Sequence, residues 1–210
     1  IFESVEKGKI KGRYTIFGKN PDKVWEFNNN NSYLIKDQKK IKLKEKPEIL
    51  IEKIIEDFKF ETPKNLPKIC SLISGYFSYD SIRYIEKIAN NCKNDLNLPD
   101  VRLLRPRTLV IHDNLKKEMF YIINVFHDEK IINYQNKFDE IKSKLLELTI
   151  QSSIKSFTKS KREFIKNIKV KSNTPKKKFL KMINKAKKYI KVGDIFQVVL
   201  SQRFEAKLTK

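Results

Sequence analysis

The stretch RTLVIHDNLKKEMFYIINVF, residues 107–126, decides the predicted fold class. It contains two runs rich in β-branched and aromatic residues, 107–113 and 119–126, joined by a short polar segment. Two such runs on either side of a short polar connection predict a β-hairpin. The chain is therefore expected to build an antiparallel sheet, because a hairpin places its two strands antiparallel.

More runs of this kind lie toward the N-terminus. They are RYTIFG (13–18), VWEF (24–27), SYLI (32–35), KIKLK (40–44) and, after a gap, ICSLISGYFSY (69–79). The first four are separated by GKNPD and by Asn-rich sequence, and Gly, Pro and Asn favour turns. We expect an antiparallel meander there and a further strand over 69–79.

Four segments carry apolar side chains at spacings of three and four residues, which predicts amphipathic helices. The expected helices start at Pro47, after Asp80 as an N-cap, near Tyr134, and at Thr174–Pro175, with Gly193 ending the last. Runs of strands with helices on one side are typical of an α+β fold. The predicted fold class is therefore α+β, with antiparallel sheets and flanking helices.

Helical and strand periodicity disappears over residues 151–173, which are rich in Ser and Lys. This composition indicates a linker or an irregular crossing. We therefore divide the chain into a first domain, 1–150, a linker, 151–173, and the start of a second domain, 174–210. Because the sequence begins at Ile1 and ends directly after a predicted strand, we expect it to be a fragment.

The chain is strongly basic, with 46 Lys and Arg against 25 Asp and Glu and a formal net charge of +21. Such a charge is typical of proteins that bind nucleic acid or an anionic surface. The lysines are scattered along the chain, however, and only Lys176–Lys178 form a cluster. A basic nucleic-acid-binding protein is therefore a distant alternative, and we expect no nucleic acid and no membrane as partner.

Cysteine spacing and hydropathy exclude other classes of protein. Cys70 and Cys92 show no CxxC spacing, so neither a zinc site nor a disulfide framework is predicted. No apolar run reaches the roughly 18 residues of a membrane helix, and no signal-type segment is present. These features predict a soluble, cytoplasmic protein.

The segment GDIFQVVLSQRF, residues 193–204, contains one unexpected residue. Its pattern predicts a strand with Phe196, Val198 and Leu200 on one face and Gln197 on the other. A buried amide without hydrogen-bond partners costs on the order of 1–3 kcal/mol. Gln197 is therefore a paired structural group, a side chain of an ordinary half-exposed strand, or part of a site.

Together with three upstream elements, this segment resembles the anthranilate synthase component I family of chorismate-using enzymes. The upstream elements are FESVEKGKIKGRYTIFG (2–18), with a Glu-Ser pair, GYFSYDSIRYIEKI (75–88) and LPDVRLLRPRTLVIHD (98–113). All four occur in the family's order. The resemblance implies the family's α+β fold, with most of the C-terminal catalytic half missing.

The resemblance also implies an activity: a lyase that converts chorismate and ammonia to anthranilate and pyruvate in tryptophan biosynthesis. Relatives that add water carry a lysine base at the position of Gln197, whereas those that add ammonia carry glutamine. Gln197 is thus the expected catalytic residue, orienting ammonia or substrate. Aminodeoxychorismate synthase component I, of folate synthesis, also uses ammonia and is the alternative. The fragment alone is expected to be inactive.

Regulation, cofactor and partner follow from the same resemblance. Tryptophan is the expected feedback inhibitor, bound near Glu3, Ser4 and Arg13, although Glu3-Ser4 is equally well a strand end or turn. Residues 1–150 then form the tryptophan-regulatory domain, and 174–210 begin the chorismate-binding domain. Mg²⁺ is the expected cofactor, with its ligands downstream of residue 210. A glutamine amidotransferase (glutaminase) subunit is the expected partner.

Overall fold

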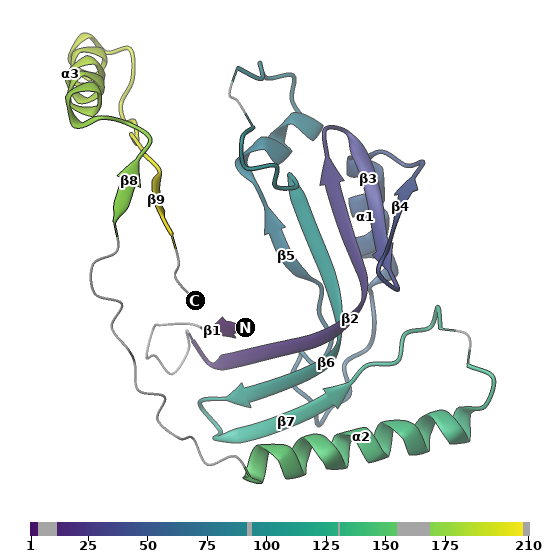
Figure 1. The fold of residues 1–210 in the computed structure, drawn as a ribbon. Helices are drawn as coiled ribbons and strands as arrows, with labels where there is room; N and C mark the ends of the chain where they lie inside the picture. Colours follow the sequence, from purple (N-terminus) through teal and green to yellow (C-terminus); the bar gives the residue numbers. More distant parts are fainter. Residues whose placement is uncertain (4–11, 92–93, 130, 155–168, 208–210) are drawn as a thin grey trace. The chain divides into compact units, whose positions relative to one another are not determined.

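The computed structural model describes residues 1–3, 12–91, 94–129, 131–154 and 169–207. The chain divides into two compact units, Ile1–Ser156 and Phe157–Lys210. In its described part the first unit carries a seven-stranded antiparallel sheet with helices, and the second carries a helix and a two-stranded sheet (Figure 1). The predicted α+β fold class is confirmed.

The elements of each unit are as follows. The strands of the first unit are β1 (Phe2–Glu3), β2 (Tyr14–Asn28), β3 (Asn31–Lys36), β4 (Lys39–Leu43), β5 (Ser74–Phe77), β6 (Val101–Asp113) and β7 (Glu118–Ile123). Its helices are α1 (Pro47–Asp57), the 3-10 helix η1 (Tyr79–Tyr84) and α2 (Tyr134–Ile154). The second unit contains β8 (Val170–Ser172), α3 (Lys176–Val192) and β9 (Phe204–Ala206).

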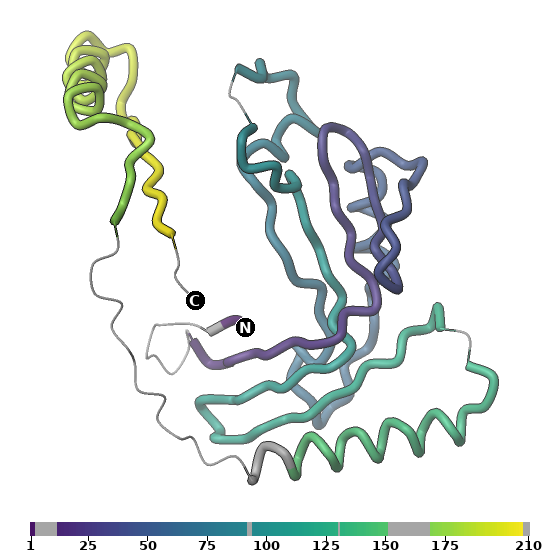
Figure 2. The backbone as a smooth tube through the Cα atoms, in the orientation of Figure 1, coloured from purple at the N-terminus to yellow at the C-terminus, as the bar shows by residue number. Residues whose placement is uncertain are grey.

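The large sheet is organised around β2 and β6. These strands pair antiparallel from Tyr14 opposite Asp113 to Phe27 opposite Val101, and Figure 2 shows them running together along their length. At one end β3 and β5 flank the pair, with β4 outside β3, and at the other end β1 and β7 flank it. Two half-sheets therefore share one central pair of strands. The predicted hairpin over 107–126 is confirmed as β6–β7.

A β-bulge lies where the two half-sheets meet. The register passes from Pro21 opposite Pro106 to Lys23 opposite Arg105, so Asp22 is the extra residue on β2. Proline has no N–H to donate to a sheet, and a bulge is a position where a strand tolerates it. The turn predicted at GKNPD is therefore wrong, because these residues form a bulge within one continuous strand.

Two clusters of buried side chains support the two half-sheets. The first consists of Trp25, Phe27, Val101 and Leu103 with Leu50 and Ile54 of α1, which covers this face of the sheet (Figure 1). The second consists of Cys70, Leu109, Ile111 and Ile122. Burying each large apolar side chain stabilises the fold by roughly 1.5–3 kcal/mol. Trp25 and Cys70 are core residues, 7% and 3% exposed.

The region between α1 and β6 is less regular than predicted. The strand expected over 69–79 is limited to β5, which is the part that pairs with Val101–Leu104 of β6. The expected helix after Asp80 is the single 3-10 helix η1, with Ser78 at its N-cap. Asp80 is not the cap, because it lies inside η1, where its carboxylate forms an ion pair with Arg83 at 2.9 Å.

The helix predicted from Tyr134 is present as α2, which packs along β7. Its apolar stripe is only partly covered, since Ile141 and Leu145 are half-buried while Phe138 is exposed. Within the described residues, no helix combines the length and the hydropathy that crossing a membrane requires.

The second unit is built on α3. The helix ends at Gly193, which adopts a left-handed φ of 85° that favours glycine, as predicted. It begins one residue later than expected, with Pro175 at the N-cap. Thr174 does not cap the helix, because it lies one residue before the N-cap, and its hydroxyl donates to Asn173 Oδ1 at 3.0 Å.

The strand predicted over 193–204 is wrong. Only its last residue, Phe204, belongs to a strand, β9, which pairs with β8. Residues 195–203 form no sheet hydrogen-bond ladder with any of the described residues. An alternating pattern forms a strand only where a neighbour supplies backbone partners, so the pattern alone did not decide this segment.

The close approach of β5 to β6 gives a test of the sheet. A Cβ added to Gly75 would lie 1.9 Å from the carbonyl oxygen of Arg102, a backbone atom that cannot move without displacing β6. We expect Gly75→Ala to lower the free energy of unfolding by roughly 2–3 kcal/mol in urea denaturation. Gly18→Ala is the control, because its Cβ would meet only side-chain atoms, those of Pro106 at 3.2 Å and of Leu109 at 3.6 Å. Equal losses in both variants would contradict this packing.

Candidate functional site

The predicted site residues fall in different parts of the chain. Glu3 and Arg13 belong to the first unit and Gln197 to the second, whereas Ser4 lies outside the described residues. Each unit is therefore considered by itself.

Glu3 and Arg13 are brought to one corner of the large sheet. Glu3 pairs with Thr15 of β2, and Thr15 in turn pairs with His112 of β6. Arg13 directly precedes β2. Glu3 and Arg13 lie near each other because β1 pairs with the start of β2, which directly follows Arg13.

The guanidinium of Arg13 is bound to Asp113, at the end of β6. Arg13 Nη2 donates to Asp113 Oδ2 at 2.6 Å, and Nε donates to Oδ2 and Oδ1 at 3.0 and 3.1 Å. Asp113 is only 1% exposed and also accepts the backbone N–H groups of Leu115 and Lys116. Arg13 therefore holds the hairpin turn after β6 against the start of β2.

This ion pair changes the titration of Asp113. The hydrogen bond from Arg13 is the main cause that lowers the pKa of Asp113 to about 2, and it outweighs burial, which acts to raise it. The N–H groups of Lys116 and Leu115 lower it further. The same hydrogen bond raises the pKa of Arg13. Asp113 is thus a permanently charged partner and not an acid–base group near neutral pH.

Asn114, the next residue, completes the corner. Its side-chain amide donates to the carbonyl of Gly12 at 3.3 Å and to Thr15 Oγ1 at 3.2 Å. Its backbone N–H donates to the carbonyl of Arg13 at 2.7 Å. Residues 12–15 are therefore fixed by the β6–β7 turn, so the observed contacts of Arg13 are structural, and a role beside a ligand stays a prediction.

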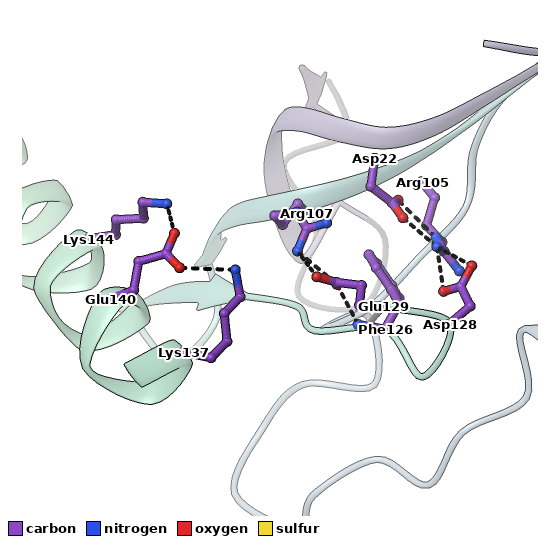
Figure 3. A network of polar contacts seen from close by, with 9 residues as sticks. All are labelled: Asp22, Arg105, Arg107, Phe126, Asp128, Glu129, Lys137, Glu140 and Lys144. Carbon is purple, nitrogen blue, oxygen red and sulfur yellow. Dashed lines mark hydrogen bonds and ion pairs between the residues drawn. The ribbon is translucent and has the colours of Figure 1, made fainter. Parts of the chain in front are cut away.

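A buried charged network at the bulge was not predicted from the sequence (Figure 3). Arg105 Nε donates to Asp22 Oδ1 at 2.9 Å, and its Nη2 donates to Asp22 and, at 3.0 Å, to Asp128. The guanidinium lies 3.7 Å from the centre of the Phe126 ring, and Lys23 also pairs with Asp128. These contacts tie the loop after β7 to the bulge of β2.

Neighbouring positive charges keep the acids of this region ionised. Burial acts to raise the pKa of Asp128, but hydrogen bonds from Lys23 and Arg105 outweigh it and lower that pKa to about 2. Arg107 donates to both carboxylate oxygens of Glu129 at 2.7 Å and, against the effect of burial, lowers its pKa. Asp128 and Glu129 are therefore charged partners in fixed ion pairs.

The sequence did contain a signal for this network. Alternation along β6 places Arg105 and Arg107 on the same face as the buried Leu103 and Leu109. An arginine on the core face of a strand must be paired, because an isolated buried charge is very costly. The pattern predicts acidic partners but does not say which acids they are.

An apolar cavity of about 510 Å³ lies between α1 and η1. Ile51 and Ile55 of α1 line it together with Phe77 and Ile82. Ile55 has the helical spacing of the buried Leu50 and Ile54, yet 59% of this residue is exposed. The sequence does not predict this cavity, because the spacing of apolar residues along α1 does not show which segment lies opposite that helix or how closely it packs.

Gln197 is exposed, in the segment between α3 and β9. The cost of burying an unpaired amide therefore does not arise here, and the polar sheet face on which Gln197 was expected to lie is absent. Among the residues that the structure describes, no three or more His, Cys, Asp or Glu side chains gather closely enough to hold a metal ion.

Comparisons with known proteins give a consistent result. Residues 8–210 match a family described as chorismate binding enzyme. Over 97% of its length the chain is 35% identical to an anthranilate synthase component 1 of Acetivibrio thermocellus, of which it covers 42%. It is 31% identical, over 98% of its length, to the chloroplastic anthranilate synthase alpha subunit 2 of Arabidopsis thaliana, of which it covers 36%.

The fold is similar to that of a solved structure, anthranilate synthase component I from Streptococcus pneumoniae TIGR4. The TM-score is 0.74, with all of this chain and 44% of the other chain covered. At 22% identity this comparison shows a common fold alone. The chain thus spans roughly two fifths of the length of the relatives it matches.

Asp113→Asn removes the charge that Arg13 binds while keeping the side-chain shape. The pKa of Asp113 is about 2 in the folded protein against 3.8 ordinarily, so its charge stabilises the fold above about pH 4. This contribution is lost as pH falls from 4 toward 2. We expect Asp113→Asn to lower the unfolding free energy at pH 7, with a gap to the wild type that closes toward pH 2.

Urea unfolding followed by circular dichroism from pH 7 to pH 2 measures this gap. Asp37→Asn, at an exposed turn, is the control and should change the unfolding free energy by less than about 0.5 kcal/mol at pH 7. A gap for Asp113→Asn that stays constant over the whole range would show that the Arg13–Asp113 pair does not stabilise the fold.

Proposed function

Because this chain belongs to the chorismate binding enzyme family, we propose that the whole protein acts as an anthranilate synthase component I. In this proposal it converts chorismate and ammonia to anthranilate and pyruvate in tryptophan biosynthesis. The observation that carries the proposal is the similarity to anthranilate synthase component 1 proteins over 97% of the chain. The activity belongs to the whole protein and not to these 210 residues alone.

In this proposal Gln197 orients ammonia or substrate. Neutral ammonia already carries the lone pair that attacks the ring, so it needs no general base. An amide both donates and accepts hydrogen bonds without carrying charge, which suits it to hold a neutral nucleophile. A lysine at this position would instead supply the base that water requires. The glutamine therefore supports amination over hydration.

Feedback inhibition by tryptophan is part of the proposal. The carboxylate of Glu3 and the hydroxyl of Ser4 offer acceptors for the ammonium and indole N–H groups of tryptophan. In this proposal Arg13 also lies beside the bound tryptophan, and its guanidinium is held in place by Asp113. In domain terms, residues 1–150 are regulatory, 151–173 a linker and 174–210 the start of the catalytic domain. The division between the compact units at 156/157, inside that linker, supports this assignment.

Enzymes of this family use Mg²⁺. The residues that the structure describes do not fit a site for this metal, because no three or more His, Cys, Asp or Glu side chains gather among them. In the proposal its ligands lie downstream of residue 210. A glutamine amidotransferase subunit supplies ammonia from glutamine, which agrees with relatives that are named as one component or subunit of an enzyme. A cytoplasmic location stays a prediction.

The whole protein, supplied with chorismate, Mg²⁺ and an ammonium salt, tests the proposal. We expect anthranilate, detected by its fluorescence, and suppression of its formation by tryptophan. Aminodeoxychorismate as the product would move the protein to folate synthesis. No turnover of chorismate would contradict the proposed activity altogether. Product formation without suppression would remove the regulatory role from Glu3, Ser4 and Arg13.

A second prediction concerns Gln197. We expect Gln197→Ala in the whole protein to lower kcat with ammonium by roughly tenfold to a hundredfold, because the nucleophile loses its orientation. Gln135→Ala, on the exposed surface of α2, is the matched control and should keep the wild-type kcat. Wild-type turnover in Gln197→Ala would remove this residue from the site.

A further inference from the structure

Residues 194–203, which carry Gln197, connect α3 to β9 without joining a sheet in the described part of the chain. Several of its apolar side chains are open to solvent, since Phe196 is 100% exposed and Val199 is 81% exposed. Because no lateral hydrogen-bond ladder fixes this segment, the position of Gln197 depends on how the two ends of the segment are held.

The first end is fixed by the last turn of α3. The N–H of Gly193 donates to the carbonyl of Ile190 at 3.2 Å, and the N–H of Asp194 donates to the carbonyl of Tyr189 at 3.0 Å. With the left-handed conformation of Gly193, these bonds form a C-terminal helix cap. The segment therefore leaves the helix in a defined direction.

The second end is fixed by Ser172, Asn173 and Thr174, which we name the latch. The N–H of Asn173 donates to the carbonyl of Arg203 at 3.0 Å. In return, the N–H of Arg203 donates to Oδ1 of Asn173 at 2.9 Å. Asn173 thus binds both backbone groups of Arg203, one through its own backbone and one through its side chain.

The other two latch residues support this contact. Thr174 Oγ1 donates to Oδ1 of Asn173 at 3.0 Å, which orients the amide. The Ser172 hydroxyl lies 3.0 Å from Oε1 of Gln202 and 2.9 Å from the carbonyl of Thr174, and donates to one of them at a time. It also accepts the N–H of Thr174 at 3.1 Å.

The latch lies directly before α3, so the chain closes on itself. It runs from the latch through α3 to Gly193, then along the segment with Gln197, and returns to the latch at Gln202 and Arg203. A catalytic group is effective only when held near its productive geometry, and a displacement of about 1 Å can cost roughly a hundredfold in rate. The side chain of Asn173 holds the second end of this segment by accepting the N–H of Arg203.

We propose that Asn173 is a positioning residue for the amination step, acting through the backbone of Arg203 on the direction of the Gln197 segment. The inference rests on the proposed function, because it takes Gln197 as the residue that orients ammonia or substrate. Asn173 itself needs no contact with substrate.

The test compares Asn173→Ala with Asn173→Asp in the whole protein. Aspartate keeps Oδ1 as an acceptor for the N–H of Arg203 and the hydroxyl of Thr174, whereas alanine removes it. We expect Asn173→Ala to lower kcat with ammonium by about tenfold and to change the KM for chorismate by less than about threefold. Asn173→Asp should recover most of the lost kcat.

Melting temperature and inhibition by tryptophan are measured on the same samples. Asn184→Ala, on the exposed surface of α3, is the matched control and should behave as the wild type. Unchanged kcat in Asn173→Ala, or equal losses in the Ala and Asp variants, overturns the inference. So does a lost kcat that is accompanied by a collapse of the melting temperature and of tryptophan inhibition, because that pattern indicates a general folding defect.

Failure of the inference can be told apart from failure of the proposed function. If the wild type forms anthranilate and Asn173→Ala is unaffected, the positioning role alone is lost. If the wild type forms no anthranilate, the proposed function is lost, and the positioning role with it.

Discussion

The antiparallel pairing of β2 with β6 is the constraint on which the first unit depends. It joins residues as distant in sequence as Tyr14 and Asp113, so closing it costs considerable chain entropy. The same pairing positions both half-sheets and both apolar clusters, which together offset that cost. Every other strand of the sheet attaches directly to this pair or to a strand that does.

The bulge explains why charged residues occur in the middle of that pair. Asp22 is extra on β2, and its carboxylate receives the buried guanidinium of Arg105. Buried ion pairs add little net stability once desolvation is counted, but a wrong register would leave these charges unpaired. Together with Asp128 and Phe126, Arg105 therefore favours a single register at the junction of the half-sheets.

The two candidate regions illustrate how a site can depend on residues that make no contact with a ligand. Arg13 is held by Asp113 and Asn114, which lie at the same end of the β2–β6 pair but about 100 residues later in the sequence. The segment that carries Gln197 follows α3 and is held by Asn173, which precedes α3. In both cases a polar side chain near a turn holds backbone on the same segment as a proposed functional residue. The family membership indicates the chemistry, because a fold by itself does not.

The sequence by itself determined the elements that depend on local spacing: the β6–β7 hairpin, the helices α1, α2 and α3, and the helix end at Gly193. It also determined the family, through the order of four motifs. Only the tertiary structure decided that GKNPD forms a bulge and that residues 195–203 form no strand, because both depend on whether a neighbouring strand supplies hydrogen bonds. It alone decided the partners of Arg13 and Arg105 as well, since a charge pattern requires a counter-charge without specifying where in the chain it lies.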